Sequence, residues 1–447
     1  MAKKLPTLSL PIHGYSADGA GVARLPDGMT CFVTGALRGE TCRVKLDKIG
    51  KTCAWGHTVG VESPSPARLV PDCPYYATCG GCATRHMTYE EELEFKRQKV
   101  EDCLRRIGGC DTPVSVIYGA KNTHRYRNKV QFPISDGAIG FYAPRTHAVT
   151  DVADCLLQPE ASSRLRAALK EYMSVYAVPA YDEGTGGGLL RHLYVRTSRV
   201  GESLCCVLVN GKSLPHEAQL VEALRKAEPN LRGIVLGVNE KKNNVILGDS
   251  YRTLWGEDTL DDTLMGLTFR LSVPSFFQVN PDQTEVLYSL ALDFAGLTGT
   301  ETALDLYCGI GTITLCLARK VRRVIGAEIV PQAIDDAKEN AKRNGVENAE
   351  FFCGDASEVA ARLADDDVRP DLITVDPPRK GLAEDVVDSI AKMAPPRVVY
   401  VSCDPATLAR DVKRFSERGY TLRKAAAVDM FPRTYHVETV ALLTQNP

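Results

Sequence analysis

ALDLYCGIGTITLCLA, from Ala303 to Ala318, decides the fold because it joins a buried strand to a helix through a glycine turn. Gly309 and Gly311 let the backbone approach a ligand closely, and the helix N-terminus offers free N–H groups at the same point. The third glycine of a dinucleotide fingerprint is replaced by Thr314, which argues against NAD and FAD. The stretch therefore predicts a nucleotide-binding turn in an α/β sheet.

Strands and helices alternate on both sides of this turn. The pattern predicts strands at 302–307, 322–327, 349–353, 371–375 and 397–402, helices at 312–320, 331–344, 358–364, 384–393 and 405–418, and closing strands near 420–428 and 436–444. Such alternation is typical of βαβ units in a largely parallel sheet, which binds ligands at the carboxyl ends of its strands. We therefore predict a Rossmann-like α/β domain over residues 269–447.

Carboxylates stand at three successive strand ends. Glu328 follows Asp305 by 23 residues, where a carboxylate accepts ribose hydroxyls, and Asp355 ends the next strand, near the expected place of an adenine amino group. Three acids without a phosphate-binding fingerprint suit an adenosyl ligand with a cationic centre. This predicts S-adenosylmethionine as the cofactor; the alternative is a set of surface acids at loop starts.

The fourth and fifth strands end in Asp376 and Cys403. In VDPPRKG (375–381), two prolines stiffen the turn that holds Asp376. In VVYVSCDPATLARDV (398–412), Cys403 lies beside a helix N-terminus, where we expect the pKa of a thiol to fall. The thiol is therefore a candidate nucleophile; the alternative is a buried, inert cysteine.

A third candidate stands in FPRTYHVETVALL (431–443), where Glu438, preceded by His436, begins the last strand. A thiol, a carboxylate base and a methyl donor suit methylation of a carbon that is a poor nucleophile, such as C5 of uracil. The thiolate adds to C6, C5 takes the methyl group, and the base removes the C5 proton before the thiol leaves. Methylation of an amino or hydroxyl group needs no covalent thiol.

LDLYCGIGT, VDPPRKG, YVSCDP and HVET, in this order, resemble the RNA uracil-C5 methyltransferase family, and PSFFQVN (274–280) matches it too. The resemblance implies that Cys403 is the nucleophile, that Glu438 deprotonates C5, and that Phe276 stacks on the flipped base. It also implies a set of residues that line the S-adenosylmethionine pocket. These are Gln278, Tyr307, Thr312 (often Asn in the family), Glu328, Asp355 and Asp376.

The N-terminal part reads as short strands broken by glycine turns, which predicts a small closed β-barrel. GAGVARLPDG, FVTGALRGE and SPSPAR resemble a TRAM domain, an OB-like barrel that binds RNA. We therefore predict a TRAM barrel over 1–64, a central α+β domain over 65–268 and the methyltransferase domain over 269–447. The resemblance further implies that a helix at 93–108 packs on the methyltransferase domain.

A cysteine cluster lies in DCPYYATCGGCATRH (72–86), which contains Cys73, Cys79 and Cys82; DVADCLLQP supplies Cys155 as a fourth thiol. This spacing is that of a metal site, and it leaves zinc and an iron–sulfur cluster open. The resemblance implies a [4Fe-4S] cluster. It also implies 23S ribosomal RNA as the substrate, because the related transfer-RNA enzymes generally lack the cluster.

The strip KNTHRYRNKVQF (121–132) contains Arg125, Arg127 and Lys129 interleaved with Tyr126. Such a strip favours contact with RNA phosphates and bases, although a solvated charged strand shows the same pattern. The target base must leave any helix to reach Cys403, so we expect a loop uridine as the substrate.

Chain length, net charge and cysteine content limit which kinds of protein these motifs can belong to. A chain of 447 residues exceeds one core of roughly 250–300 residues, and a net charge of −2 leaves RNA contact to local basic patches. Fifteen cysteines with no signal peptide indicate a cytoplasmic protein with reduced thiols rather than a disulfide framework. No membrane span and no protein partner are predicted. The alternatives are a transfer-RNA uracil-C5 methyltransferase and a non-catalytic RNA-binding assembly factor.

Overall fold

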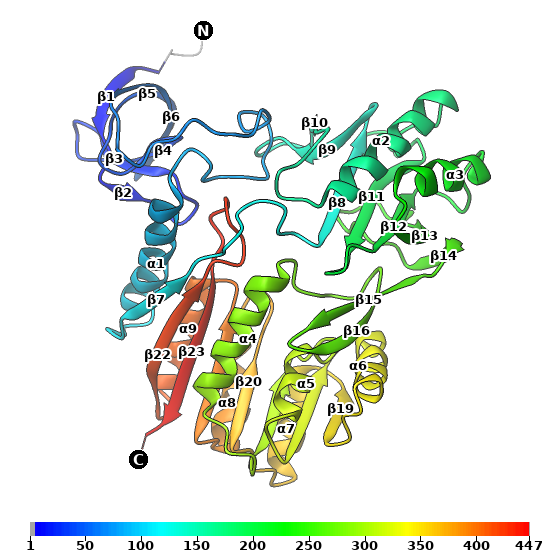
Figure 1. Ribbon diagram of the computed structural model, residues 1–447. Coiled ribbons are helices and arrows are strands. Elements are labelled where there is room, and N and C mark those ends of the chain that lie inside the picture. Colours follow the sequence, from blue (N-terminus) through cyan, green and yellow to red (C-terminus); the bar gives the residue numbers. More distant parts are fainter. Residues whose placement is uncertain (1–4, 447) are drawn as a thin grey trace.

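The parallel strands predicted on either side of the glycine turn belong to an eight-stranded sheet with the order β19-β18-β17-β20-β21-β23-β22-β7. The computed structural model describes residues 5–446 (Figure 1). The first five strands in this order are parallel, and β23 runs antiparallel between β21 and β22. Their bounds are β17 (Thr302–Leu306), β18 (Arg323–Glu328), β19 (Ala349–Cys353), β20 (Leu372–Val375), β21 (Arg397–Ser402), β22 (Tyr420–Val428) and β23 (Glu438–Gln445).

Helices cover both faces of this sheet, which is why its strands are nearly continuous apolar runs. One apolar cluster joins the sheet to α7 (Ala356–Asp365), α8 (Glu384–Met393) and α9 (Pro405–Ser416). A second joins the opposite face to α4 (Pro281–Ala295), α5 (Thr312–Ala318) and α6 (Pro331–Arg343). Each face therefore has its own hydrophobic core.

Three segments that begin before residue 269 also pack on this unit. Helix α1 (Tyr89–Arg106) contacts α9, and Val100 and Leu104 belong to the first apolar cluster. Strand β7 (Val114–Tyr118) pairs in parallel with β22 at the sheet edge. The hairpin of β15 (Thr259–Leu264) and β16 (Leu267–Ser272) packs on α6. The unit built on the eight-stranded sheet is therefore discontinuous in the sequence.

The central region contains a seven-stranded sheet with the order β10-β9-β8-β11-β12-β13-β14. All residues of β11 and β12 are buried, and α2 and α3 pack on one face. The bounds are β8 (Lys129–Ser135), β9 (Ala138–Tyr142), β10 (Val149–Asp151), α2 (Glu160–Val175), β11 (Leu190–Thr197), β12 (Ser203–Val209), α3 (Glu217–Ala227), β13 (Leu231–Val238) and β14 (Ser250–Gly256).

The N-terminal region is a curled six-stranded sheet with the order β1-β5-β6-β4-β3-β2 (Figure 1). Its strands are β1 (Thr7–Pro11), β2 (Gly14–Tyr15), β3 (Gly21–Arg24), β4 (Thr30–Thr34), β5 (Thr41–Ile49) and β6 (Cys53–Ser63). Its identification as an RNA-binding TRAM barrel stays a prediction, and residues 1–4 of the predicted domain lie outside the described residues.

The cysteines lie both in the core and at the surface. All fifteen are free, and Cys205, Cys206 and Cys316 are core residues. Within residues 5–446, no helix has the length and apolar character needed to cross a membrane.

Candidate active site

Five neighbouring strands end at one edge of the large sheet. Leu306 pairs with both Ala327 and Val375, so the residues that follow these three strands lie at the same level. Chain order along the sheet reverses between β17 and β20, which is where open α/β sheets bind ligands. The predicted site residues at strand ends are therefore brought together at this edge.

The glycine turn predicted to bind the cofactor is tightly wound. Tyr307, Gly309 and Gly311 have φ values of 68°, 55° and 85°, in the left-handed region. Glu328 stabilises the turn, because Oε2 accepts the N–H of Gly309 at 3.2 Å and Oε1 accepts the N–H of Val330 at 3.0 Å. Hydrogen bonds thus hold the glycine turn against Glu328, the carboxylate predicted to bind the ribose.

Two acids at this edge have structural partners. Asp305 is buried and accepts hydrogen bonds from Thr314 at 2.6 Å and Thr374 at 2.7 Å, and burial raises its pKa to about 6. Asp355 caps the N-terminus of α7, and its bonds with Ser357 lower its pKa. The Asp305 side chain therefore links β17 to α5 on one side of the glycine turn and to β20 in the sheet.

Thr312 begins α5, and its hydroxyl lies 2.9 Å from the hydroxyl of Tyr288. Gln278 is buried, and its carbonyl oxygen accepts a hydrogen bond from Asn128 at 3.0 Å. A hydrogen bond therefore holds each of these two residues to a distant part of the chain: Thr312 through its hydroxyl and Gln278 through its main-chain carbonyl.

Cys403 and Glu438 lie at adjacent strand ends. Ser402 pairs with Thr439 across β21 and β23, so the thiol that follows Ser402 and the carboxyl that precedes Thr439 reach the same edge. Glu438 is buried and Cys403 is half-buried. Burial, with repulsion from Asp376, raises the pKa of Glu438 to about 8 against the opposing effect of Arg379.

The predicted lowering of the Cys403 pKa is wrong for the free protein. Burial, Glu438 and Asp376 raise the pKa of Cys403 to about 11, and Arg379 opposes them only in part. Asp404 caps the N-terminus of α9, because its side chain accepts hydrogen bonds from the N–H groups of Ala406 at 2.9 Å and Thr407 at 3.3 Å. Burial and two acids outweigh the helix N-terminus, which leaves a protonated thiol.

Asp376 completes this group of acids. Burial and the nearby Asp305 raise its pKa to about 7. An opposite charge brought close to such carboxyls favours their ionised forms. A cationic ligand at this edge would therefore convert a largely protonated site into one with a functional carboxylate base.

Phe276 projects from the loop between β16 and α4 and is 63% exposed. Arg196 donates to the carbonyl of Ser275 at 2.6 Å, which ties this loop to β11. Lys129 Nζ lies 5.8 Å from the centroid of the Phe276 ring, and burial, Arg196 and Arg127 lower the pKa of Lys129 to about 7. The exposed ring is therefore an anchored stacking surface flanked by basic groups.

The structure gives Arg125 a different environment from that predicted. Its guanidinium pairs with Asp154 at 2.8 and 2.6 Å and donates to the carbonyls of Cys155 and Gln158 at 2.8 and 2.9 Å. These contacts orient the guanidinium toward the segment that carries Cys155, and the contact of Arg125 with RNA stays a prediction. Arg127, in contrast, lies over the ring of Phe431 at 6.0 Å.

The four predicted metal-ligating cysteines, Cys73, Cys79, Cys82 and Cys155, line one cavity of about 290 Å³. Among residues 5–446, however, no three His, Cys, Asp or Glu side chains are close enough to hold a metal ion. A single-ion site is therefore not supported.

Arg85 lines the same cavity, and its side chain is 1% exposed. One of its nitrogen atoms pairs with Asp72 at 2.5 Å, while Nε and Nη2 are buried and have no partner in the described part of the chain. Four thiols beside a buried cation with two unused donors fit a larger anionic group with thiolate ligands better than a lone cation.

Sequence reasoning missed Arg379, Arg196 and Asn128. Arg379 follows the two prolines of VDPPRKG and is the cation whose field acts on both Cys403 and Glu438. The sequence signal that could have identified Arg379 is its position directly after two prolines, which make the turn rigid. Arg196 and Asn128 gave no signal, because they act through backbone carbonyls of a loop distant in sequence.

The sheet order, the glycine turn and the acid at the end of β18 define an S-adenosylmethionine-dependent methyltransferase fold. The crystal structure of a Pyrococcus abyssi tRNA (uracil-54, C5)-methyltransferase in complex with S-adenosyl-L-homocysteine is similar over nearly the whole chain. The TM-score is 0.80 at 27% identity, and the match covers 98% of this chain and 99% of that one.

The family model for tRNA (uracil-5-)-methyltransferases matches residues 88–446. An RNA methyltransferase of Clostridium tetani is 44% identical over 99% of this chain and 97% of its own length. One of Halalkalibacterium halodurans is 43% identical over 98% and 97%. The chain belongs to the RNA uracil-5 methyltransferase family, which confirms the predicted enzyme class and its methyl donor, S-adenosylmethionine.

Proposed function

We propose that this enzyme methylates C5 of a loop uridine in 23S ribosomal RNA through a covalent bond between Cys403 Sγ and C6 of the base. The observation that carries this proposal is the pairing of β21 with β23, which brings Cys403 and Glu438 to one edge beside Asp376. A reactive thiol and a buried acid are the two groups that C5 methylation requires and that methylation of a heteroatom does not.

The residues of this chain divide the work as follows. Cys403 gives its proton to solvent and the resulting thiolate adds to C6, which makes C5 nucleophilic. S-adenosylmethionine, when bound, supplies an electrophilic methyl group on a cationic sulfur. Glu438, ionised in the loaded site, then accepts the C5 proton, and the electrons of the C5–H bond expel the Cys403 thiolate. His436, two residues earlier, is held neutral because burial lowers its pKa to about 4.

The adenosyl pocket is proposed at the edge around the glycine turn. Glu328 supports this placement, because its carboxylate already accepts a hydrogen bond from the turn at Gly309. We assign ribose contact to Glu328, adenine contact to Asp355, and contact with the methionine portion to Asp376. Tyr307, Thr312 and Gln278 would close the pocket around the cofactor.

The RNA surface is proposed to run from Phe276 toward the N-terminal sheet. Phe276 would stack on the flipped uracil, with Lys129 and Arg127 near its phosphates, in keeping with the basic groups that flank the exposed ring. Arg125 is assigned a positioning role at Cys155 instead. The curled N-terminal sheet is proposed to be an OB-like TRAM barrel that holds RNA outside the active site. We also propose a cytoplasmic location.

The cysteine cavity is proposed to hold a [4Fe-4S] cluster with Cys73, Cys79, Cys82 and Cys155 as ligands. The buried Arg85 guanidinium supports an anionic occupant. Uracil methylation moves no electrons to or from a cluster, so its role would be structural. Iron and inorganic sulfide should co-purify with the anaerobically prepared wild-type protein and should be lost from a Cys79→Ala variant; a metal-free wild type would refute this assignment.

Two substitutions test the covalent mechanism. Cys403→Ala should abolish both the methylated product and any adduct. Glu438→Gln should accumulate an RNA–protein adduct that survives a denaturing gel, because addition and methyl transfer proceed while proton removal fails. Turnover by Glu438→Gln at the wild-type rate would refute the base assignment, and product formed by Cys403→Ala would refute the mechanism.

The second candidate substrate is transfer RNA, which the matching family model and the Pyrococcus abyssi protein favour. The four cysteines around one cavity favour ribosomal RNA instead. Unmodified 23S RNA fragments and unmodified transfer RNA should be offered to the same preparation with radioactive methyl donor. Labelling of transfer RNA alone would overturn the ribosomal assignment. A non-catalytic assembly factor is disfavoured by the family membership itself.

A further inference from the structure

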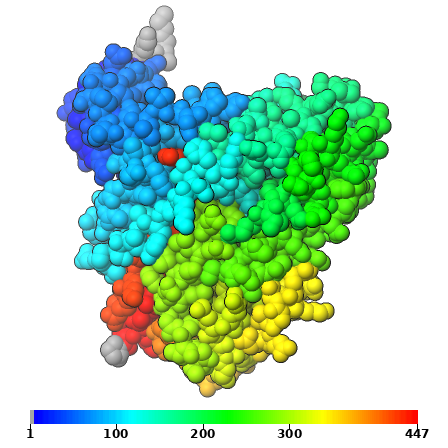
Figure 2. Space-filling model, in the orientation of Figure 1, coloured from blue at the N-terminus to red at the C-terminus, as the bar shows by residue number. Residues whose placement is uncertain are grey.

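The loop of residues 429–437 connects β22 to β23 and ends at Glu438. Donors from outside the loop hold its carbonyl groups at 2.9 to 3.2 Å. Gln283 and Asn280 donate to the carbonyls of Asp429 and Met430. Lys96 and Lys99, on α1, donate to the carbonyls of Phe431 and Tyr435. Tyr126 donates to the carbonyl of Pro432, and the main-chain N–H of Ala83 donates to that of Arg433. A small red patch amid blue and cyan atoms in Figure 2 shows the C-terminal part of the chain reaching into the N-terminal part. The position of Glu438 therefore depends on distant segments.

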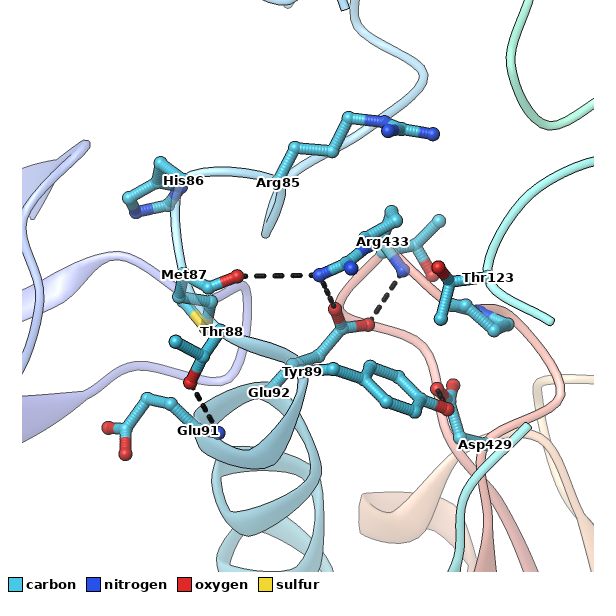
Figure 3. A network of polar contacts seen from close by, with 12 residues as sticks. Arg85, His86, Met87, Thr88, Tyr89, Glu91, Glu92, Thr123, Asp429 and Arg433 are labelled. Carbon is cyan, nitrogen blue, oxygen red and sulfur yellow. Dashed lines mark hydrogen bonds and ion pairs between the residues drawn. The ribbon is translucent and has the colours of Figure 1, made fainter. Parts of the chain in front are cut away.

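Arg433 joins this loop to the segment 83–92 through both its main chain and its side chain (Figure 3). Its backbone has a φ of 70°, and its N–H donates to Glu92 Oε1 at 2.7 Å. Its guanidinium donates to Glu92 Oε2 at 3.4 Å and to the carbonyl of Met87 at 3.3 Å. Both the main chain and the side chain of Arg433 are thus tied to the beginning of α1.

Glu92 in turn belongs to a fully buried network. Lys96 Nζ lies 2.7 Å from Glu92 and 2.6 Å from Asp429, and the three side chains are 0% exposed. Tyr89 donates to Asp429 at 2.7 Å. Removing one member of such a network leaves a buried charge without its partner, at a cost of roughly 3–5 kcal/mol. Helix α1 therefore gives Arg433 a rigid support on one side.

The cysteine segment supports Arg433 on the other side. The N–H groups of Ala83 and Thr84 donate to the carbonyl of Arg433 at 2.9 and 3.3 Å. Ala83 directly follows Cys82, whose thiol lines the cysteine cavity. A displacement of Cys82 would therefore remove two hydrogen bonds from a residue that lies five positions before Glu438.

We propose that Arg433 is a positioning residue through which the segment 79–84 controls the placement of Glu438, and hence the removal of the C5 proton. While Cys82 is held in its cavity, the loop delivers Glu438 to the active site. When the segment is released, proton removal slows but addition by Cys403 continues, because Cys403 is held by β21 and α9 instead. This inference rests on the proposed function, since it concerns one step of that reaction.

Arg433→Gly tests the positioning role. Glycine adopts positive φ freely, so the backbone is preserved while the guanidinium is removed. We expect the RNA adduct to accumulate at least about tenfold over wild type, with tritium release from C5-tritiated uridine slowed by a similar factor. A merely structural loss would reduce adduct and product together, which would overturn the proposal, as would wild-type kinetics. Asp367→Gly is the matched control, because Asp367 is exposed, has a φ of 59° and lies in the loop between α7 and β20, away from the strand ends that carry the site.

The coupling to the cysteine segment is tested by a double-mutant cycle. Cys82→Ser should accumulate the adduct as Arg433→Gly does, and the effects of the two should not add, because the guanidinium of Arg433 and the cysteine segment support the same residue from two sides. Additive effects would overturn the coupling. If Cys82→Ser does not fold, Ala83→Pro replaces it, because this change removes the N–H that binds the carbonyl of Arg433 and leaves the cysteines intact. It should accumulate the adduct, and its failure to do so would overturn the coupling. Absence of both adduct and product in wild type would instead refute the proposed function, independently of Arg433.

Discussion

Burial and mutual repulsion keep Cys403, Glu438 and Asp376 protonated to a higher pH than usual, with pKa values of about 11, 8 and 7. The nucleophile and the base are thus both poorly ionised in the free enzyme at neutral pH. Their ionisation depends on what binds beside them, because a cationic ligand lowers the pKa of neighbouring acids. The resting site is protected against chance reactions of its thiol.

The first prediction concerns the pH dependence of turnover. Because the ionised forms of Cys403 and Glu438 are the active ones and both pKa values are raised, each group contributes up to about tenfold per pH unit below its pKa. The value of kcat/KM should therefore rise by up to about a hundredfold per unit from about pH 6 toward the pKa of Glu438, and by up to about tenfold per unit above it. A methyl-transfer assay over about pH 6 to 9 measures this. A profile that falls with pH across this range would contradict the assigned roles. In Glu438→Gln, adduct formation should retain only the thiol dependence.

The second prediction concerns stability. A raised carboxyl pKa means that the folded protein keeps a proton that the unfolded chain loses, so Glu438 contributes stability below about pH 4.5 that is lost as the pH rises through about 8. Glu438→Gln should therefore be more stable than wild type at about pH 8.5, by roughly 3–5 kcal/mol. The two melting temperatures should converge near pH 5. An equal difference at both pH values would show that Glu438 is not the titrating group.

Among the elements, the loop of VDPPRKG is fixed to α9 by Gly381 and Asp411. Asp411 is fully buried and accepts hydrogen bonds from the N–H of Leu382 and the hydroxyl of Tyr400, both at 2.8 Å. A Cβ at Gly381 would lie 2.6 Å from Asp411 Oδ2 and 2.5 Å from Arg410 Nη2, and its φ of 71° adds strain. The positions of Asp376 and Arg379 therefore depend on the close packing of Gly381 against Arg410 and Asp411 of α9.

The third prediction is that Gly381→Ala disturbs the active site as well as the fold. We expect a lower melting temperature and at least about a tenfold loss of turnover, equivalent to about 1.4 kcal/mol, because the loop that carries Asp376 must shift. Gly419→Ala is the matched control: its φ of 82° imposes similar strain, but a Cβ there meets no atom within 4 Å. Equal effects of both substitutions would attribute the loss to backbone strain alone.

The sequence predicts those elements whose evidence is local. The strands β17 to β21 are short, mostly apolar runs, and Glu328, Asp376 and Cys403 stand at or directly after the ends of β18, β20 and β21, so these residues could be located. Strand β7 gives no comparable signal, because VSVIY belongs to this sheet only through its pairing with β22, far along the chain. Likewise, the contact of Arg125 with Asp154 and the raised pKa of Cys403 depend on neighbours that only the folded chain brings together.

At the scale of the whole molecule, a groove of about 1220 Å³ separates the N-terminal sheet from α1. Phe32 and Trp55 lie on its floor with ring centroids 6.4 Å apart, and Lys48 lies 5.4 Å from the Trp55 ring. Aromatic faces next to cations are typical of surfaces that bind single-stranded nucleic acid. The groove also reaches Lys99, which contacts the carbonyl of Tyr435 near the active site.

The fourth prediction is that Trp55→Ala weakens RNA binding without affecting the cofactor. Stacking of a base on an aromatic ring is worth about 1–3 kcal/mol, so the Kd for RNA should rise by roughly 5- to 150-fold. Filter binding measures this, and calorimetry should show an unchanged Kd for S-adenosylmethionine. Trp255→Ala, on the far edge of the central sheet, is the control. Unchanged RNA affinity in Trp55→Ala would exclude the groove from the RNA path.

The pairing of β7 with β22 also has a consequence for biosynthesis. Residues 114–118 leave the ribosome early, but their partner strand is made only near the far end of the chain. Until then β7 and the apolar side of α1 have nothing to cover them, and exposed edges of this kind promote aggregation of nascent chains. A messenger interrupted before residue 420 would thus yield a polypeptide that chaperones must retain, however well its first half has folded.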